Sequence, residues 1–376
     1  MLASKQRILK ICFFSITTIA MIAMILFGLN TDINIGRNPI PGSEFPRARV
    51  IEAIDSGQQQ ILIVEILNGD FRGQQVETRN IQFIDAAVNP QIGQTIIIHF
   101  DYLGNGNYSS HVHSYARDFI IYIIVALFLL LLVLVGGRKG LSSAFGLVFT
   151  FVTILFLLIP AIMRGAPPAF LTIMVALLIT AVSLTAIMGF EKKTWVGIVG
   201  TLVGIAFYCL FYGIIAHALR VSGANISEMN QLVGLGFAEP ANITQLLFCG
   251  ILIASLGAVT DTTVSVASTT AEISSANANM KFDELFRASM RMARDCIGSS
   301  ANTLILAFTG TFFITLIMFQ LHELNYTMLI NRIDIAIEVL RAISASAGMV
   351  LCAPATALLG SYAYRARPMK FRSTGK

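Results

Sequence analysis

Long apolar runs dominate this chain, and their lengths match the thickness of a lipid bilayer. An α-helix needs about 20 apolar residues to cross a hydrocarbon core of about 30 Å, and residues 8–29 already form such a run. The chain is 55% hydrophobic and only 12% charged, whereas a soluble domain carries about 25% charged residues. The sequence therefore predicts an α-helical polytopic membrane protein.

Eight transmembrane helices are expected. Residues 8–29 are too long for a signal-peptide core and no small-residue cleavage site follows them, so residues 1–29 are interpreted as a signal-anchor helix. A seven-helix domain then occupies residues 118–365, before a basic tail at residues 366–376. Its helices are predicted at residues 119–135, 141–163, 169–190, 194–219, 243–272, 298–319 and 333–362.

Residues 30–117 are hydrophilic and are predicted to form a small extracytoplasmic β domain. Runs rich in Ile and Val indicate four or five short strands, typical of an SH3-like or OB-like barrel. The clearest runs lie at residues 47–54, 60–67, 74–84 and 95–100. His99, His111 and His113 are expected to be solvated loop residues rather than a metal or pH site, because H-x-H alone lacks a defined third ligand. No metal or cofactor is expected.

The distribution of Lys and Arg orients the helices. With the N-terminus in the cytoplasm, the cytoplasmic segments hold sixteen of these residues, and the short outer loops hold only Arg164, Arg220 and Arg332. This bias follows the positive-inside rule, so both termini are expected in the cytoplasm and residues 30–117 outside it. Because the basic residues are spread over loop ends, the net charge of +5 does not indicate nucleic-acid binding.

One stretch, residues 257–272, carries the most polar chemistry of the helical domain. Four of its side chains recur at helical spacing and so share one face: Asp261, Ser265, Ser268 and Glu272. A carboxylate at the centre of a membrane helix costs about 2.5–3.5 kcal/mol, so it normally faces a protein partner or water. We expect this face to be a polar seam inside the bundle that binds a substrate or an ion. The alternative is a polar inner-leaflet end, with Asp261 hydrogen-bonded to a neighbour.

The depth of this stretch leaves two geometries open. If the helix is straight, Glu272 lies beyond the hydrocarbon core. The helix is therefore either strongly tilted or broken near Gly257, as in transporter sites built from discontinuous helices.

Two later helices add candidate binding residues. Asp295 and Asn302 extend the polar material into the next helix. Glu338 and Arg341 lie on the outer half of the last helix, with Arg341 close to the membrane midplane. The partner of Arg341 is either Glu338, one turn away, or a carboxylate of residues 257–272. The first alternative is a structural ion pair.

Two segments concern packing rather than chemistry. Gly200-x-x-x-Gly204 is a close-packing face, for which contacts inside the bundle are favoured over a dimer. A homo-oligomer is the alternative. Residues 281–294 are amphipathic and are expected to lie on the cytoplasmic leaflet as a connecting helix.

Short motifs recur in a fixed order: Gly136-Gly-Arg-Lys-Gly140, Gly257-Ala-Val-x-Asp261, Ser268-x-x-x-Glu272, Arg294-Asp-x-x-Gly298, Asn302-Thr-Leu-Ile-Leu-Ala307 with Thr309-Gly310, and Pro354-x-x-Ala357. Over about residues 45–365 the chain resembles the YibE/F family of bacterial polytopic membrane proteins. The resemblance implies a bacterial plasma-membrane protein with an outer domain and a helix bundle, but no substrate. The resemblance also implies that Asp261, Glu272, Asp295 and Asn302 are positions characteristic of the family. The chain departs from the family at Thr260, Thr262 and Thr263, where relatives are more apolar.

The first functional hypothesis is a secondary transporter or permease for a small molecule or ion. Its coupling ion would bind Asp261 and Glu272, and Arg341 would hold a counter-charge or an anionic substrate group. The alternative is a non-transporting scaffold or sensor that acts through the β domain. An enzyme is not expected, because neither H-E-x-x-H nor G-x-S-x-G occurs.

Overall fold

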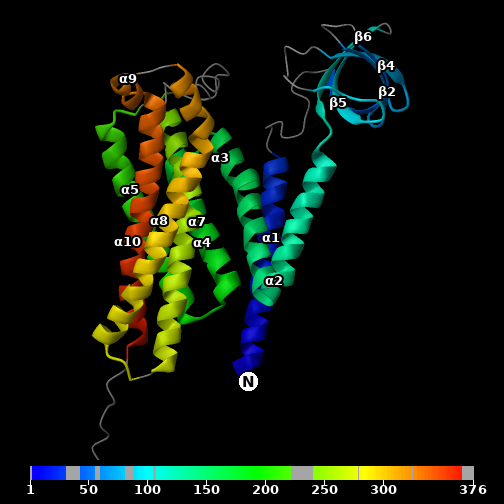
Figure 1. Cartoon of the computed structure of the whole chain (residues 1–376). Helices are drawn as coiled ribbons and strands as arrows, with labels where there is room; N and C mark the ends of the chain where they lie inside the picture. The colour runs from blue at the N-terminus through cyan, green and yellow to red at the C-terminus, as the bar shows by residue number, and fades with distance from the viewer. Residues whose placement is uncertain are drawn as a thin grey trace, which may run out of the picture. The chain divides into compact units, whose positions relative to one another are not determined.

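The computed structural model describes residues 2–30, 43–55, 60–80, 88–104, 107–221, 240–277, 279–322 and 325–365. It divides into two units, which are described separately: Met1–Asn30 with Arg138–Lys376, and Thr31–Gly137 (Figure 1). Several predicted segments lie wholly or partly outside the described residues. These are the linker at 38–43, the end of the strand at 74–84, the turn at 104–106, the loop at 220–240 and the basic tail.

The smaller unit contains a closed β-barrel, as the alternating runs predict (Figure 1). Its strands are β1 (Ser43–Glu44), β2 (Arg47–Asp55), β3 (Gln60–Ile66), β4 (Gln75–Asn80), β5 (Thr95–Gly104) and β6 (Asn107–Tyr115). The sheet order is β1-β5-β2-β3-β4-β6, and an additional β5–β6 pairing closes it. Only β4 and β6 are parallel. This Greek-key closure of five long strands is of the OB type, one of the two expected alternatives.

The expectation of loop histidines is wrong, because His111 and His113 lie on β6 and His99 lies on β5. β6 is hard to detect in the sequence because its inward side chains are not all apolar. Val112 is buried, but Ser110 donates a hydrogen bond to the buried Thr78, with 2.9 Å between their hydroxyl oxygens. The strand therefore lacks the regular apolar alternation that identifies its neighbours.

The larger unit is helical. Its elements, with the whole of α2, are α1 (Leu2–Leu29), α2 (Asp118–Thr153), the π-helix η1 (Ile154–Leu158), α3 (Ile159–Met163), α4 (Pro168–Met188), α5 (Lys192–Ala218), α7 (Pro240–Ala276), α8 (Phe282–Leu321), α9 (Tyr326–Ile330) and α10 (Ile333–Tyr364). Among the described residues, seven segments are long and apolar enough to cross a membrane. The longest, Asp118–Met163, is interrupted at Gly137, whose φ of 55° and ψ of −131° are not helical. This interruption lies between the helices predicted at 119–135 and 141–163.

Two expectations about helix continuity are corrected. α7 runs unbroken from Pro240 to Ala276, so the alternative of a break near Gly257 is excluded. α8 is likewise one helix, and residues 281–294 do not form a separate surface helix. Its first turns instead bury Leu285 and Ala293, the latter in a cluster with residues of α7 and α10.

The core of the bundle lies where α5, α7 and α10 approach closely. Gly204 of α5 faces Val259 of α7 and Cys352 of α10, with no room for a Cβ atom. Gly200 faces Thr263 and Thr356 in the same way. The prediction that the Gly200-x-x-x-Gly204 face packs inside the bundle is confirmed.

Candidate functional site

α7 presents opposite faces to different surroundings. The face turned into the bundle is made of small and hydroxyl side chains: Thr262, Thr263, Val266, Ala267 and Thr270. On the face predicted to be the seam, Asp261, Ser265 and Glu272 are exposed and Ser268 is half-buried. The expectation that this polar face lies inside the bundle is therefore wrong for Ser265 and Glu272, whereas Asp261 borders a cleft between helices.

Hydroxyl groups on the buried face of α7 hold neighbouring helices. The Oγ1 atoms of Thr263 and of Thr201 on α5 are 2.9 Å apart and share a hydrogen bond. Thr270 is hydrogen-bonded to Ser289 of α8, with 3.0 Å between their side-chain oxygens. Hydrogen bonds of this kind contribute about 0.6 kcal/mol on average between membrane helices. We assign these residues to packing rather than to ligand binding.

A cleft of about 320 Å³ lies beside Asp261, between α2, η1, α4 and α7. Most of its lining is apolar and comes from Ile and Leu side chains. The polar lining residues are Ser143, Thr150, Thr180, Ser183, Thr260 and Asp261. The cleft is open on one side, and its volume is within the range of small-molecule sites.

The polar side chains that line the cleft all present oxygen atoms, from hydroxyl groups and one carboxylate. Asp261 is the only ionisable side chain among the described residues that line it. The hydroxyls of Thr150, Thr180 and Thr260 each donate to the carbonyl four residues earlier, at 2.9, 2.8 and 2.6 Å. Because those protons are engaged, the hydroxyl oxygens present lone pairs. The cleft can therefore accept hydrogen bonds from a ligand or take up a cation or a proton at Asp261.

One wall of the cleft is built from an irregular helix. Ile154, which lines the cleft, begins the π-helix η1. A π-turn is rare and often occurs at functional sites, since it shifts the side chains that follow it. α1 packs behind this wall, because a Cβ atom on Gly28 would lie 2.8 Å from Cδ1 of Phe156.

Glu338 and Arg341 form a second polar site on α10. Arg341 Nη1 donates to Glu338 Oε2 at 3.1 Å, and the side chains are 32% and 15% exposed. The guanidinium also lies 5.9 Å from the ring centroid of Phe308 on α8. The predicted local ion pair is confirmed, and the pairing of Arg341 with a carboxylate of residues 257–272 is not observed.

The other predicted site residues lie neither in the cleft at Asp261 nor at the Glu338–Arg341 pair. Asp295 and Asn302 are exposed on α8, and neither is among the residues that line the cleft. Glu272 is three turns beyond Asp261 on α7 and also lies outside the lining. Of the predicted set, the structure therefore places Asp261 alone in the cleft.

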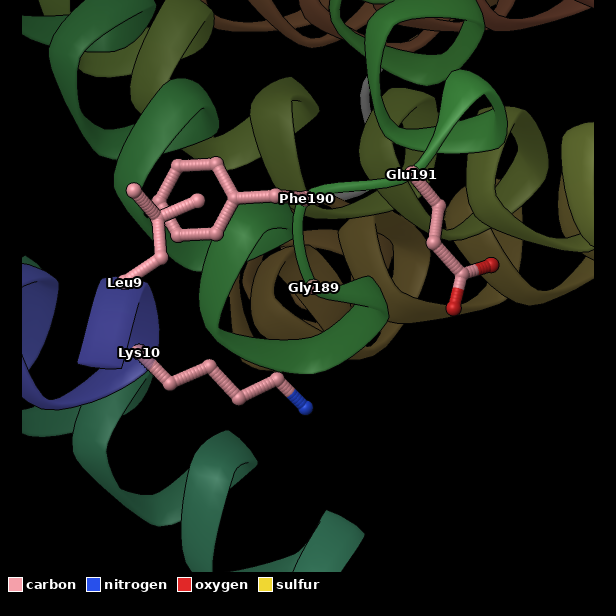
Figure 2. Close-up of a pocket in the computed structure, with 5 residues that line it drawn as sticks. All are labelled: Leu9, Lys10, Gly189, Phe190 and Glu191. Carbon is pink, nitrogen blue, oxygen red and sulfur yellow. The ribbon is translucent and has the colours of Figure 1, made fainter. Parts of the chain in front are cut away.

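A smaller pocket, shown in Figure 2, lies where α1 meets the turn after α4. It is lined by Leu9, Lys10 and Gly189–Glu191, and Lys10 extends its amine beneath the turn. A cation at a helix C-terminus is favourable because of the helix dipole. With a volume of about 30 Å³, the pocket has room for water but not for a substrate.

Sequence reasoning missed the cleft residues contributed by α2 and α4. A signal was present, because Ser143, Gly146 and Thr150 recur at spacings of three and four residues and so share a helix face. Thr180 and Ser183 repeat the pattern on α4. Small and hydroxyl residues at this spacing are also used for helix packing, so the pattern by itself did not distinguish a cleft from a contact.

Comparison with known protein families gives a match for most of the helical unit. A family model described as "YibE/F-like protein" matches residues 124–366, which is more than half of the chain. The matched range contains α2 from residue 124 onward, together with η1, α4 and α7. It therefore contains all the residues that line the cleft. No curated protein and no solved structure matches the chain.

Proposed function

Because the chain belongs to the YibE/F-like family and its helical unit holds the cleft beside Asp261, we propose that it is a secondary transporter or permease. The observation that carries this proposal is a cleft between membrane-compatible helices in which Asp261 is the one carboxylate among the described lining residues. Ionisable residues in such segments commonly mark substrate or ion pathways. The substrate class is a small molecule or ion that oxygen ligands can bind.

In this proposal Asp261 carries the coupling proton or cation. Glu272 does not bind the coupling ion in this proposal, since it lies outside the cleft lining. Arg341 has its charge balanced by Glu338 and is assigned a structural role. No His, Lys or Cys is among the described lining residues, and we propose no enzymatic activity.

The proposed location is the bacterial plasma membrane, with eight spans and both termini in the cytoplasm. A continuous helix over Asp118–Met163 would be about 69 Å long, more than twice the hydrocarbon thickness of about 30 Å. The interruption at Gly137 supports two spans, with Arg138 and Lys139 at the cytoplasmic turn. Residues 30–117 are then extracytoplasmic, in agreement with the positive-inside rule.

Loss of ligand binding on Asp261→Asn tests the proposal. The full chain is purified in detergent, and its melting temperature is measured against pH, cations and small metabolites. A ligand present at about 100 times its Kd adds roughly 2.7 kcal/mol to the folded state. We expect at least one ligand to raise the melting temperature of the parent protein and not that of Asp261→Asn.

The matched control is Glu272→Gln, which removes the same charge from the same exposed face of α7 but outside the cleft. It should respond to the ligand as the parent does. An identical ligand response in Asp261→Asn would remove the basis of the proposal. Uptake of the identified ligand into liposomes that contain the protein then separates transport from binding alone.

The second candidate is a scaffold or sensor that acts through the β domain. It is favoured by His99 and Asp101 on β5 and His111 on β6, which the strand register brings together on the barrel. Deletion of residues 38–115 distinguishes the candidates, because a scaffold loses its role while a transporter retains ligand binding at the cleft.

A further inference from the structure

The barrel brings four titratable side chains to one outward face. His99 and Asp101 alternate on β5, and His111 and His113 alternate on β6. His99 is directly opposite His111 in the antiparallel register. The intervening residues, Phe100 and Val112 among them, point into the barrel core, so the histidines and Asp101 share the outer face.

His99 is held in place on several sides. Its Nδ1 lies 3.1 Å from His111 Nε2, and its Nε2 lies 3.4 Å from Oδ1 of Asp101. The ring of Phe45 stacks on it with 4.7 Å between centroids. His99 Nε2 is nevertheless buried without a hydrogen bond of good geometry. Such an unsatisfied nitrogen is costly, and a small rotation of the ring toward Asp101 would satisfy it.

We propose that His99 and His111 bind a divalent transition-metal ion of the zinc, copper or nickel type. Two imidazole nitrogens at about 2.0–2.1 Å from a tetrahedral zinc ion are about 3.3 Å apart, close to the 3.1 Å separation found here. Neutral imidazole is a preferred ligand for these metals. The ion takes the place of the proton that the two rings share.

Asp101 completes the arrangement as a positioning residue. A carboxylate that accepts the N–H of a ligating histidine fixes the tautomer and the ring orientation. With the proton of His99 on Nε2, facing Asp101, the lone pair of Nδ1 points toward His111. Phe45 keeps the ring in its plane by stacking.

Among the described residues, the site presents two protein ligands, His99 and His111. Among the described residues no three His, Cys, Asp or Glu side chains converge to hold a metal, and Phe45 also contacts His113, with 5.2 Å between ring centroids. Water or an incoming ligand then fills the remaining coordination positions. A metal held in this way is open to exchange, which suits sensing or capture of the ion rather than a structural centre.

The test uses the full chain, purified with a tag that lacks histidine and stripped of metal with a chelator. Equilibrium dialysis with Zn²⁺ measures stoichiometry and affinity, and the electron spin resonance spectrum of bound Cu²⁺ counts nitrogen ligands. We expect one ion per chain and a spectrum that requires two nitrogens. His99→Gln and His111→Gln should each abolish this binding, and Asp101→Asn should weaken it about tenfold.

His322→Gln is the matched control, because His322 lies at the end of α8 and its Nδ1 contacts a backbone carbonyl. It should bind zinc as the parent does. The proposal is overturned if the parent binds no ion, if the copper spectrum shows no nitrogen ligation, or if the His99→Gln/His111→Gln variant binds as the parent does. The copper spectrum of the parent answers the question even where a variant fails to fold. The outcome is independent of the cleft at Asp261.

Discussion

Glu338→Gln is expected to lower the free energy of unfolding by about 3 kcal/mol. Breaking a buried ion pair by removing one partner costs about 3–5 kcal/mol, because the other charge is left uncompensated. The lower end applies here, since Arg341 is one-third exposed whereas Glu338 is only 15% exposed. Arg341 lies about 12 Å along α10 from its first residue at 1.5 Å per residue, within the thickness of a hydrocarbon core of about 30 Å.

Glutamine retains one acceptor for Arg341 but not the negative charge. The ring of Phe308 remains beside the guanidinium, and a cation–π contact recovers only about 0.5–2 kcal/mol. Removal of both charges in Glu338→Gln/Arg341→Gln should therefore restore most of the lost stability. Unfolding of the purified protein in mixed micelles, followed by circular dichroism, measures all three proteins.

Asp334→Asn is the matched control, one turn earlier on the same helix. Asp334 pairs with Arg332 at 2.9 Å, but the two side chains are 39% and 43% exposed. Exposed pairs contribute about 0–1 kcal/mol, so this change should be nearly neutral. If Glu338→Gln were equally neutral, the environment of Arg341 would be aqueous, and α10 would line a water-filled path.

The sequence predicted features that depend on local spacing. Glu338 and Arg341 meet because residues three apart are neighbours on any helix. In the same way, Asp261, Ser265 and Glu272 do lie on one side of α7. The break at Gly137 followed from a glycine-rich, basic segment between two apolar runs, since glycine accepts a positive φ.

The direction in which a helix face points was not predictable by the same means. In water, apolar faces turn inward, but lipid is as apolar as leucine, so burial in a bundle favours small residues instead. Thr263 and Ala267 are therefore fully buried, while Asp261 is exposed in the isolated chain. Both faces of α7, the hydroxyl face and the carboxylate face, are visible in the sequence. The packing of α5 and α10 decides which of the two is enclosed.

The three histidines were named from the sequence, but they were interpreted as solvated loop residues, and this interpretation failed for a different reason. His99 and His111 are twelve residues apart and meet only through the β5–β6 register. Register depends on which residues fill the barrel core, and the inward Ser110 concealed β6 from pattern reading. Contacts across strands are therefore less accessible from sequence than contacts along one helix.

Gly204→Ala and Gly348→Ala are each expected to lower the free energy of unfolding by about 2 kcal/mol. A methyl group on Gly204 would lie 2.6 Å from Cγ1 of Val259 and 2.9 Å from Cβ of Cys352. One on Gly348 would lie 2.9 Å from the carbonyl oxygen of Gly204. Backbone and Cβ atoms cannot rotate away, so the helices must move apart. Overpacking of this kind costs about 1–3 kcal/mol.

Gly213→Ala is the control on the same helix, because nothing lies within 4 Å of the added methyl group. It should be neutral or stabilising by about 0.5–1 kcal/mol, since alanine is the better helix former. Because Gly204 and Gly348 contact each other, Gly204→Ala/Gly348→Ala should cost less than the sum of the single changes. Equal stability of Gly204→Ala and Gly213→Ala would contradict the close packing of α5 on α7 and α10.

The same substitutions connect packing to the cleft. Val259, which faces Gly204, is two residues before Asp261 on α7. A methyl group at Gly204 that displaces α7 also moves the carboxylate that borders the cleft. We therefore expect Gly204→Ala, and not Gly213→Ala, to weaken any ligand whose binding depends on Asp261. Unchanged ligand affinity in a destabilised Gly204→Ala protein would mean that α5 moves instead of α7, and that the cleft tolerates strain on the opposite face of its helix.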